Sequence, residues 1–165
     1  MLIAALALTL MTAPVQDAAV AGRVDPLSSE GSAVMAPINA TFAALAARDG
    51  SLIMPHVDAN GRLLASVRGP TGTRVSTPTW EAFTGGLRPG LERFEEIMVD
   101  PLVAIDGDVA MVWGEYIFRI DGRISHCGVN HFDLIRRDGA WKIVNLTWTQ
   151  RQTGCEEIAA RIAAG

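Results

Sequence analysis

The chain has 165 residues, 49% of them hydrophobic, and a mean hydropathy of +0.23, which provides apolar material for one ordinary domain and too little length for two. Its formal net charge of −4 comes with no Lys or Arg cluster beyond Arg136-Arg137, which argues against a nucleic acid or an anionic membrane surface as a partner.

The N-terminal segment has features of a secretory signal. Met1 to Met11 is an uncharged apolar run, and Ala19-Val20-Ala21 offers an A-x-A cleavage pattern. The run is shorter than the ~20 apolar residues that span a bilayer. We therefore predict a signal peptide over residues 1–21, export to the periplasm or medium, no stable membrane anchor, and a flexible lead-in over residues 22–31. Because a basic n-region is missing, the alternative is an N-terminal helix that is disordered or packed in the core.

Residues 32–48 predict an amphipathic helix, because apolar side chains recur at spacings of three and four among many alanines, at Val34, Ile38, Phe42 and Leu45. Pro37 fits this helix if it lies in or near the first turn. Residues 51–57 predict a second, short helical turn.

Strands follow. Residues 62–68 and 74–77 predict a strand pair, and Pro78-Thr79 caps a brief helix over residues 80–84. Further β-rich runs, separated by Asp-Pro and Asp-Gly turns, span residues 91–99, 102–105, 109–120, 124–137 and 141–152. Helices followed by an antiparallel meander indicate an α+β fold. We expect bulges or kinks at Asp100-Pro101 and Gly114, and a frayed final helix over residues 155–164.

The last two strands form a hairpin around Asp138-Gly139, the strongest short-range hairpin signal. Placing Leu134 opposite Ile143 pairs Phe132 with Asn145 and gathers polar side chains on one face, namely His126, Asn130, Asn145, Thr147, Thr149 and Arg151. These residues form a binding site, or they lie at the open end of the hairpin in solvent or at a subunit interface.

Two cysteines, Cys127 and Cys155, lie in the C-terminal part of the chain. In an exported protein they can form a disulfide if Gly154 turns the chain back toward the hairpin. The alternative is two free thiols, because disulfide geometry is restrictive.

The order of these elements and the ending Asp-Gly-Ala-Trp-Lys-Ile at residues 138–143 resemble the nuclear transport factor two-like superfamily, which includes SnoaL-like and ketosteroid-isomerase-like proteins. The segments 108–113, 116–118 and 125–130 are similar to an exported bacterial branch labelled lumazine-binding. The resemblance covers residues 32–151. It implies one domain over residues 32–165, a cone-shaped, cystatin-like α+β barrel whose strongly curved antiparallel sheet wraps the long N-terminal helix. It also implies a pocket at the open end and, often, a homodimer.

Two residues are candidates for moving a proton. His126 exchanges a proton near neutral pH, and Asn130 on the same face of the hairpin can donate and accept hydrogen bonds. Asp58 matches by position the catalytic carboxylate that ketosteroid-isomerase-like proteins carry near the helix-to-strand passage. The alternative is that Asp58 and Asn60 simply form a turn. Arg151 would bind a carboxylate or an enolate oxygen.

The remaining polar residues predict one further ligand contact and no metal site. Tyr116, the only tyrosine, places its hydroxyl group in the pocket if its face of the strand is concave. His126 and His131 are an odd number of residues apart, so they point to opposite faces and predict no metal site. No phosphate loop, dinucleotide fingerprint, nucleophile elbow or zinc-protease motif is present, and no cofactor is predicted.

Three functions remain open. The leading hypothesis is an exported homodimer that binds a small apolar or aromatic molecule without catalysis, with Tyr116, Asn130, Asn145, Thr147 and Arg151 as ligand contacts. The second is a cofactor-free isomerase, dehydratase or cyclase in which His126 or Asp58 moves a proton. The third is a dimeric interaction module without a pocket, which bulky side chains filling the cone would favour, namely Phe42, Phe118, Phe132 and Trp141.

Overall fold

A computed structural model describes residues 22–164, so the predicted signal peptide lies outside the described residues. The elements are β1 (Gly22–Val24), α1 (Ser29–Ala47), the 3-10 turns η1 (Gly50–Leu52) and η2 (Met54–His56), β2 (Leu63–Gly69), β3 (Gly72–Ser76), α2 (Trp80–Gly86), β4 (Phe94–Asp106), β5 (Val109–Ile120), β6 (Arg123–Arg137), β7 (Ala140–Gln150) and α3 (Glu156–Ala164). The α+β fold is confirmed. Within these residues, no helix is both long and apolar enough to cross a membrane.

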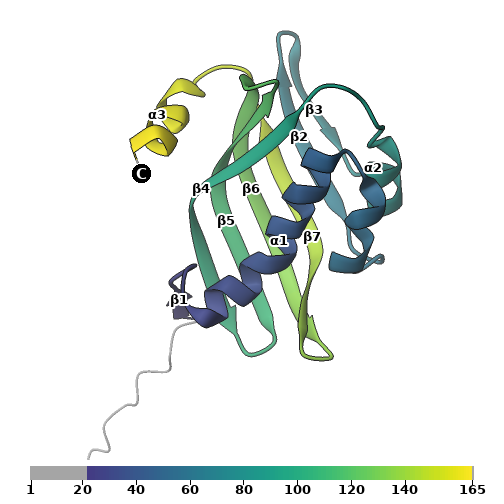
Figure 1. The fold of residues 1–165 in the computed structure, drawn as a ribbon, viewed down its shortest axis with the longest axis vertical. Coiled ribbons are helices and arrows are strands. Elements are labelled where there is room, and N and C mark those ends of the chain that lie inside the picture. The colour runs from purple at the N-terminus through teal and green to yellow at the C-terminus, as the bar shows by residue number, and fades with distance from the viewer. Residues whose placement is uncertain (1–21, 165) are drawn as a thin grey trace, which may run out of the picture.

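The sheet has seven strands in the order β1-β4-β5-β6-β7-β2-β3 and is curved without closing on itself. Neighbouring strands are antiparallel except β2 and β7, which are parallel. Figure 1 shows α1 lying across the concave face, with α2 beside its C-terminal end. The long helix is therefore held inside the curved sheet, as the resemblance implies.

The N-terminal elements begin earlier than predicted. The supposed flexible lead-in contains β1, which pairs with β4. The helix α1 begins at Ser29, where Ser28 accepts a hydrogen bond from the Gly31 amide. Pro37 consequently lies in the helix interior rather than in the first turn. A proline there removes one helical hydrogen bond, and the burial of this face of α1 offsets the cost.

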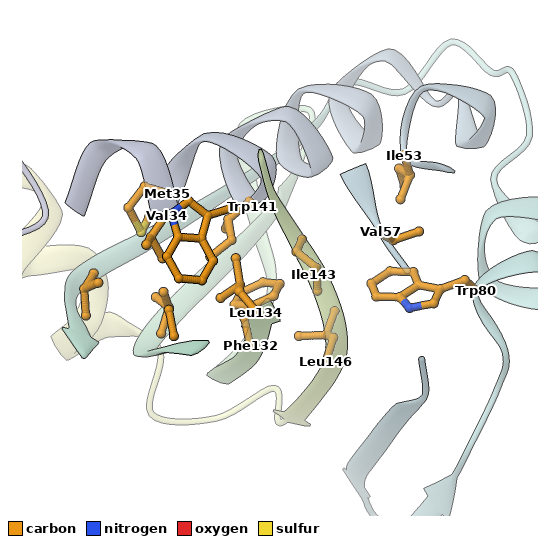
Figure 2. Close-up of a cluster of buried hydrophobic side chains, with 14 of the residues drawn as sticks. Val34, Met35, Ile53, Val57, Trp80, Phe132, Leu134, Trp141, Ile143 and Leu146 are labelled. Atoms are coloured by element: carbon orange, nitrogen blue, oxygen red, sulfur yellow. The ribbon is translucent and has the colours of Figure 1, made fainter. Parts of the chain in front are cut away.

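The main core lies between α1 and the concave face of the sheet (Figure 2). Val34 and Ile38 of α1 have no exposed surface, and they pack above Phe132 and Leu134 of β6. Burying each such side chain stabilises the fold by roughly 1.5–3 kcal/mol. The apolar spacing seen in the sequence therefore fixes which side of α1 faces the sheet.

The long strand β4 runs through the predicted break at Asp100-Pro101. The register with β5 shifts between Val99 and Leu102, and Asp100 adopts a φ of 43°, so the predicted bulge is confirmed. Gly114 is not itself a bulge. A Cβ atom there would collide with the Met98 side chain and approach Pro101, so Gly114 makes room for the bulge opposite.

A second bulge corrects the predicted hairpin register. Leu134 does lie opposite Ile143, but Asp133 lies opposite Asn145, so Val144 is an extra residue in β7. The carbonyl oxygen of Val144 accepts a hydrogen bond from the Trp80 indole nitrogen at 3.1 Å. Beyond this bulge every β7 side chain faces the opposite way from the prediction.

The cysteines form a disulfide, with a Cα–Cα distance of 5.6 Å, and Gly154 makes the predicted turn at a φ of 69°. The bond holds α3 against the convex face of β4 and β5. There Ile158 packs beside Ile117, in an apolar cluster separate from the main core. The free-thiol alternative is therefore wrong.

Candidate functional site

A cavity of about 210 Å³ lies between the concave face of the sheet and the C-terminal half of α1, with part of α2 beside it. All five phenylalanines of the chain and its only tyrosine line this cavity, together with Trp148 and several aliphatic side chains. Phe42, Phe118 and Phe132 lie in the wall without filling the space, whereas Trp141 belongs to the main core. The cavity is thus mostly aromatic, with a few polar groups in one wall.

Glu96 of β4 is the carboxyl group in this wall. Strand alternation places it on the concave face between Phe94 and Met98. Although Glu96 keeps some accessible surface as a residue, its carboxyl group is buried, and burial raises its pKa to about 7. The Asn130 side-chain amide donates a hydrogen bond to Glu96 Oε1 at 2.7 Å, which favours the ionised form and opposes the shift.

Tyr116 of β5 lies in the same wall and is 1% exposed. Its hydroxyl group donates a hydrogen bond to the carbonyl oxygen of Thr149 at 3.0 Å. Burial raises the pKa of Tyr116 far above its usual range, and the nearby Glu96 carboxylate adds to this shift, while Arg151 opposes it. The hydroxyl group therefore stays protonated, with its proton directed at β7 rather than into the cavity.

His126 of β6 faces the cavity as well. Its ring stacks on Phe118 at 4.8 Å between centroids and meets the edge of Tyr116 at 5.9 Å. Its Nδ1 atom lies 3.2 Å from the Ser125 hydroxyl oxygen. Burial lowers the pKa of His126 to about 4, so the imidazole is neutral at physiological pH.

Three predicted site residues therefore share one cavity, namely Tyr116, His126 and Asn130. Strand alternation explains this grouping on β6, because His126 and Asn130 are four residues apart and face the same way. His131 faces outward, where it packs against Trp113 and lies 3.4 Å from Asp133. Among residues 22–164, no group of three or more potential metal ligands occurs.

The other predicted ligand contacts lie outside this cavity. Asn145 and Thr147 face the convex side because of the extra residue Val144. Asn145 accepts from the Arg62 amide at 2.9 Å and donates to Asp133 at 3.2 Å, while Thr147 is exposed. Arg151 lines a different pocket, together with Arg68 and Thr73.

Asp58 also lies outside the cavity. It forms a turn with Asn60, which was the alternative to a catalytic role. Its carboxylate accepts from the Asn60 amide at 3.0 Å and pairs with Arg137 at 2.8 Å. The Asn60 hydrogen bond and, to a smaller extent, the Arg137 charge lower the pKa of Asp58. Asp58 therefore holds a loop and a turn together.

Glu96 was missed by the sequence reasoning. A signal existed, because one of the two glutamates at Glu95-Glu96 must lie on the concave face of a strand. Strand alternation could not show which glutamate faces inward, because both faces of this strand are apolar. Phe94 and Met98 share a face with Glu96, while Ile97 and Val99 share one with Glu95. The bond from Asn130, two strands away, identifies Glu96.

Comparisons with solved structures identify the fold. An NTF2-like protein from Cytophaga hutchinsonii superposes with a TM-score of 0.61 at 13% identity, covering 75% of this chain and 100% of that one. A cystatin-like protein of unknown function from Nostoc punctiforme gives 0.59 at 10% identity, covering 77% and 96%. A candidate calcium/calmodulin dependent protein kinase II association domain from Xanthomonas campestris gives 0.59 at 22% identity, covering 79% and 95%.

No family model matches the sequence, and no curated protein matches it. The structural likeness shows that the chain has the NTF2-like, cystatin-like fold that the resemblance implied. At these identities it shows the fold alone, so function has to be argued from the cavity.

Proposed function

We propose that this NTF2-like domain binds a small, mainly aromatic molecule in the cavity beneath α1. The observation that carries the proposal is that all five phenylalanines of the chain line one cavity of about 210 Å³ that also holds a buried carboxyl group. Ligand sites are typically apolar pockets with a few placed polar groups. A flat heteroaromatic ring of the lumazine type, as the resemblance implies, falls in this class.

Native mass spectrometry of protein purified from its own host tests this proposal. A small molecule released on denaturation would identify the ligand directly. Protein that is empty is titrated with 2-naphthol, whose binding is followed by calorimetry. We expect Leu87→Trp to abolish binding, because Leu87 lines the cavity, and Leu91→Trp to leave binding unchanged, because Leu91 is 100% exposed. Absence of both a retained molecule and 2-naphthol binding would contradict the proposal.

A second candidate function is cofactor-free proton transfer, as in an isomerase, dehydratase or cyclase. The observation that favours it is the raised pKa of Glu96, because a general base works best when its pKa is near the operating pH. The Glu96 carboxylate would take a proton from the carbon next to a carbonyl group, leaving an enolate whose oxygen accepts from the Asn130 amide. The same carboxyl group would then return the proton to a carbon of the enolate.

Proton transfer has its own readout. Incubation of 2-tetralone in D₂O should exchange its α-protons for deuterium faster in the presence of the protein, as followed by NMR. Glu96→Gln should abolish the acceleration, and Glu95→Gln should keep it, since Glu95 pairs with Arg119 outside the cavity. Equal exchange with the two variants would eliminate Glu96 as the base.

Export and a homodimer complete the proposal. The disulfide supports an oxidising compartment. Exposed apolar side chains at Trp113 (50%) and Val109 (60%) on β5 support an interface between copies. Sedimentation of the wild type and of Trp113→Glu tests this, because the charged variant should be monomeric; a wild-type monomer would contradict the homodimer.

A further inference from the structure

We propose that the cavity selects a small aromatic molecule that carries an ammonium group, with the cationic nitrogen beside the Glu96 carboxyl group and the ring among the phenylalanines. This inference rests on the proposed binding function and narrows its ligand class. It follows from what surrounds Glu96 in the structure.

The Glu96 carboxyl group has no positive partner. Among residues 22–164 it forms no ion pair, and the Asn130 amide is its hydrogen-bond donor. Two guanidinium groups of the neighbourhood are engaged elsewhere, since Arg119 pairs with Glu95 and Arg48 with Glu92. Burying a carboxylate without a countercharge costs free energy. A cationic ligand would remove that cost by pairing with Glu96.

Aromatic faces flank this carboxyl group. Glu96 is paired across the sheet with Phe118, and Phe118 packs against Phe94 at 5.2 Å between centroids. Tyr116 lies in the same wall. The face of an aromatic ring attracts ammonium groups, so these rings and the carboxylate favour the same charge. A neutral hydroxyl group in place of the ammonium group would gain neither attraction, because both depend on the positive charge.

Few titratable groups face Glu96. The cavity residues from α1, α2 and β7 are uncharged, and those from β5 and β6 that titrate are Tyr116 and His126. Tyr116 stays protonated and His126 stays neutral above pH 5. Outside the cavity, Arg93 and Glu95 line an adjacent pocket that Glu96 also borders, and Arg151 lies near enough to act on Tyr116. Between pH 5 and 9, Glu96 is therefore the group in the cavity that changes charge.

Calorimetry with three probes of nearly equal size tests the proposal at pH 8, using 2-phenylethylamine, 2-phenylethanol and phenylacetate. We expect the amine to bind at least tenfold more tightly than the alcohol, and phenylacetate to bind more weakly than either. Glu96→Gln should weaken amine binding at least tenfold and leave alcohol binding unchanged. Glu95→Gln, one residue away on the opposite face of β4, should behave as the wild type.

The pH dependence provides a second measure that needs no variant. Below pH 7 the free protein holds a proton on Glu96 that the ammonium group must displace into solvent, so amine affinity should fall about tenfold per pH unit. The affinity for the alcohol should not follow this slope.

Each contrary result has a distinct meaning. Equal affinities for amine and alcohol, or an unaltered amine affinity in Glu96→Gln, would overturn the cation preference and leave the binding proposal standing. Tightest binding of phenylacetate would overturn it in favour of an anionic ligand. Failure of all three probes would also overturn it, and 2-naphthol binding would then decide whether the cavity binds aromatic molecules at all.

Discussion

The Asn130 amide donates its 2.7 Å hydrogen bond to Glu96 across β5, which lies between the strands that carry the two residues. The bond fixes the orientation of the carboxyl group, because β4 and β6 are both held to β5 by backbone hydrogen bonds. Because this burial exists only in the folded protein, the pKa of Glu96 is higher in the folded chain than in the unfolded chain. The pH dependence of stability should therefore report on it.

Glu96 should make the folded protein less stable as the pH rises. Its pKa is about 7 in the folded protein against an ordinary value of 4.5, so between these values the folded chain holds a proton that the unfolded chain has lost. Stability from this group is fully present below pH 4.5 and falls by up to about 1.4 kcal/mol per pH unit until pH 7. In urea unfolding from pH 4.5 to 7.5, the free energy of unfolding of Glu95→Gln should fall with pH relative to that of Glu96→Gln, because both variants keep His126 and only the first keeps the Glu96 carboxyl group. Parallel profiles for the two variants would contradict it.

His126 should act in the opposite direction. Its pKa falls to about 4 on folding, so between pH 4 and 6.5 the unfolded chain binds the additional proton and stability rises with pH. The two groups therefore oppose each other in the wild type near pH 5 to 6. His126→Phe, which keeps a ring against Phe118, should show a steeper loss with pH than the wild type in the same urea series. A profile identical to that of the wild type would contradict the burial of His126.

The indole of Trp80 should be needed for the bulge at Val144. Trp80→Phe leaves the Val144 carbonyl without its donor, which costs about 1–3 kcal/mol for a buried group. Trp141→Phe is the matched control, since Trp141 is a core tryptophan that stacks under Arg136. We expect the larger loss of unfolding free energy in Trp80→Phe. A larger loss in Trp141→Phe would mean that packing volume outweighs the hydrogen bond.

The disulfide should hold α3 in place. It closes a loop with a sequence separation of 28 residues, for which chain entropy predicts about 3–4 kcal/mol of stabilisation. The double variant Cys127→Ala, Cys155→Ala should lose this amount, and amide exchange in residues 156–164 should become fast while exchange in β5 stays slow. Retained protection of α3 would show that its apolar contacts suffice.

Arg48 should control access to the cavity. Its guanidinium group lies 4.3 Å from the centre of the Phe94 ring, donates to the Arg88 carbonyl at 2.8 Å and pairs with Glu92. Arg48→Gln should release residues 87–93 and speed both association and dissociation of 2-naphthol in stopped-flow fluorescence. Arg62→Gln, which removes contacts to the loop at residues 60–61, should leave both rates unchanged. Slower exchange in Arg48→Gln would contradict a gating role.

Local signals in the sequence predicted most of the fold. The Asp138-Gly139 turn placed Leu134 opposite Ile143, and the helical spacing chose the buried side of α1, because both depend on neighbouring residues alone. The bulge at Val144 was not predictable from neighbouring residues, since the side chain that donates a hydrogen bond to it, Trp80, lies more than 60 residues earlier. Glu96 was missed for the same reason, because its partner Asn130 lies two strands away.

The extra residue in β7 has a consequence for how this chain could change. It reverses the parity of the strand, so that even-numbered residues from Leu146 onward enter the cavity and odd-numbered ones leave it. Deleting Val144 would leave Leu146 and Trp148 in the cavity, because Asn145 would then follow Ile143 in a regular strand and still lie opposite Asp133. A strand that kept Val144 but lost the bulge would instead turn Asn145 and Thr147 toward the cavity, and the hydrogen bond from the Trp80 indole to the Val144 carbonyl oxygen stabilises the arrangement with the aromatic wall.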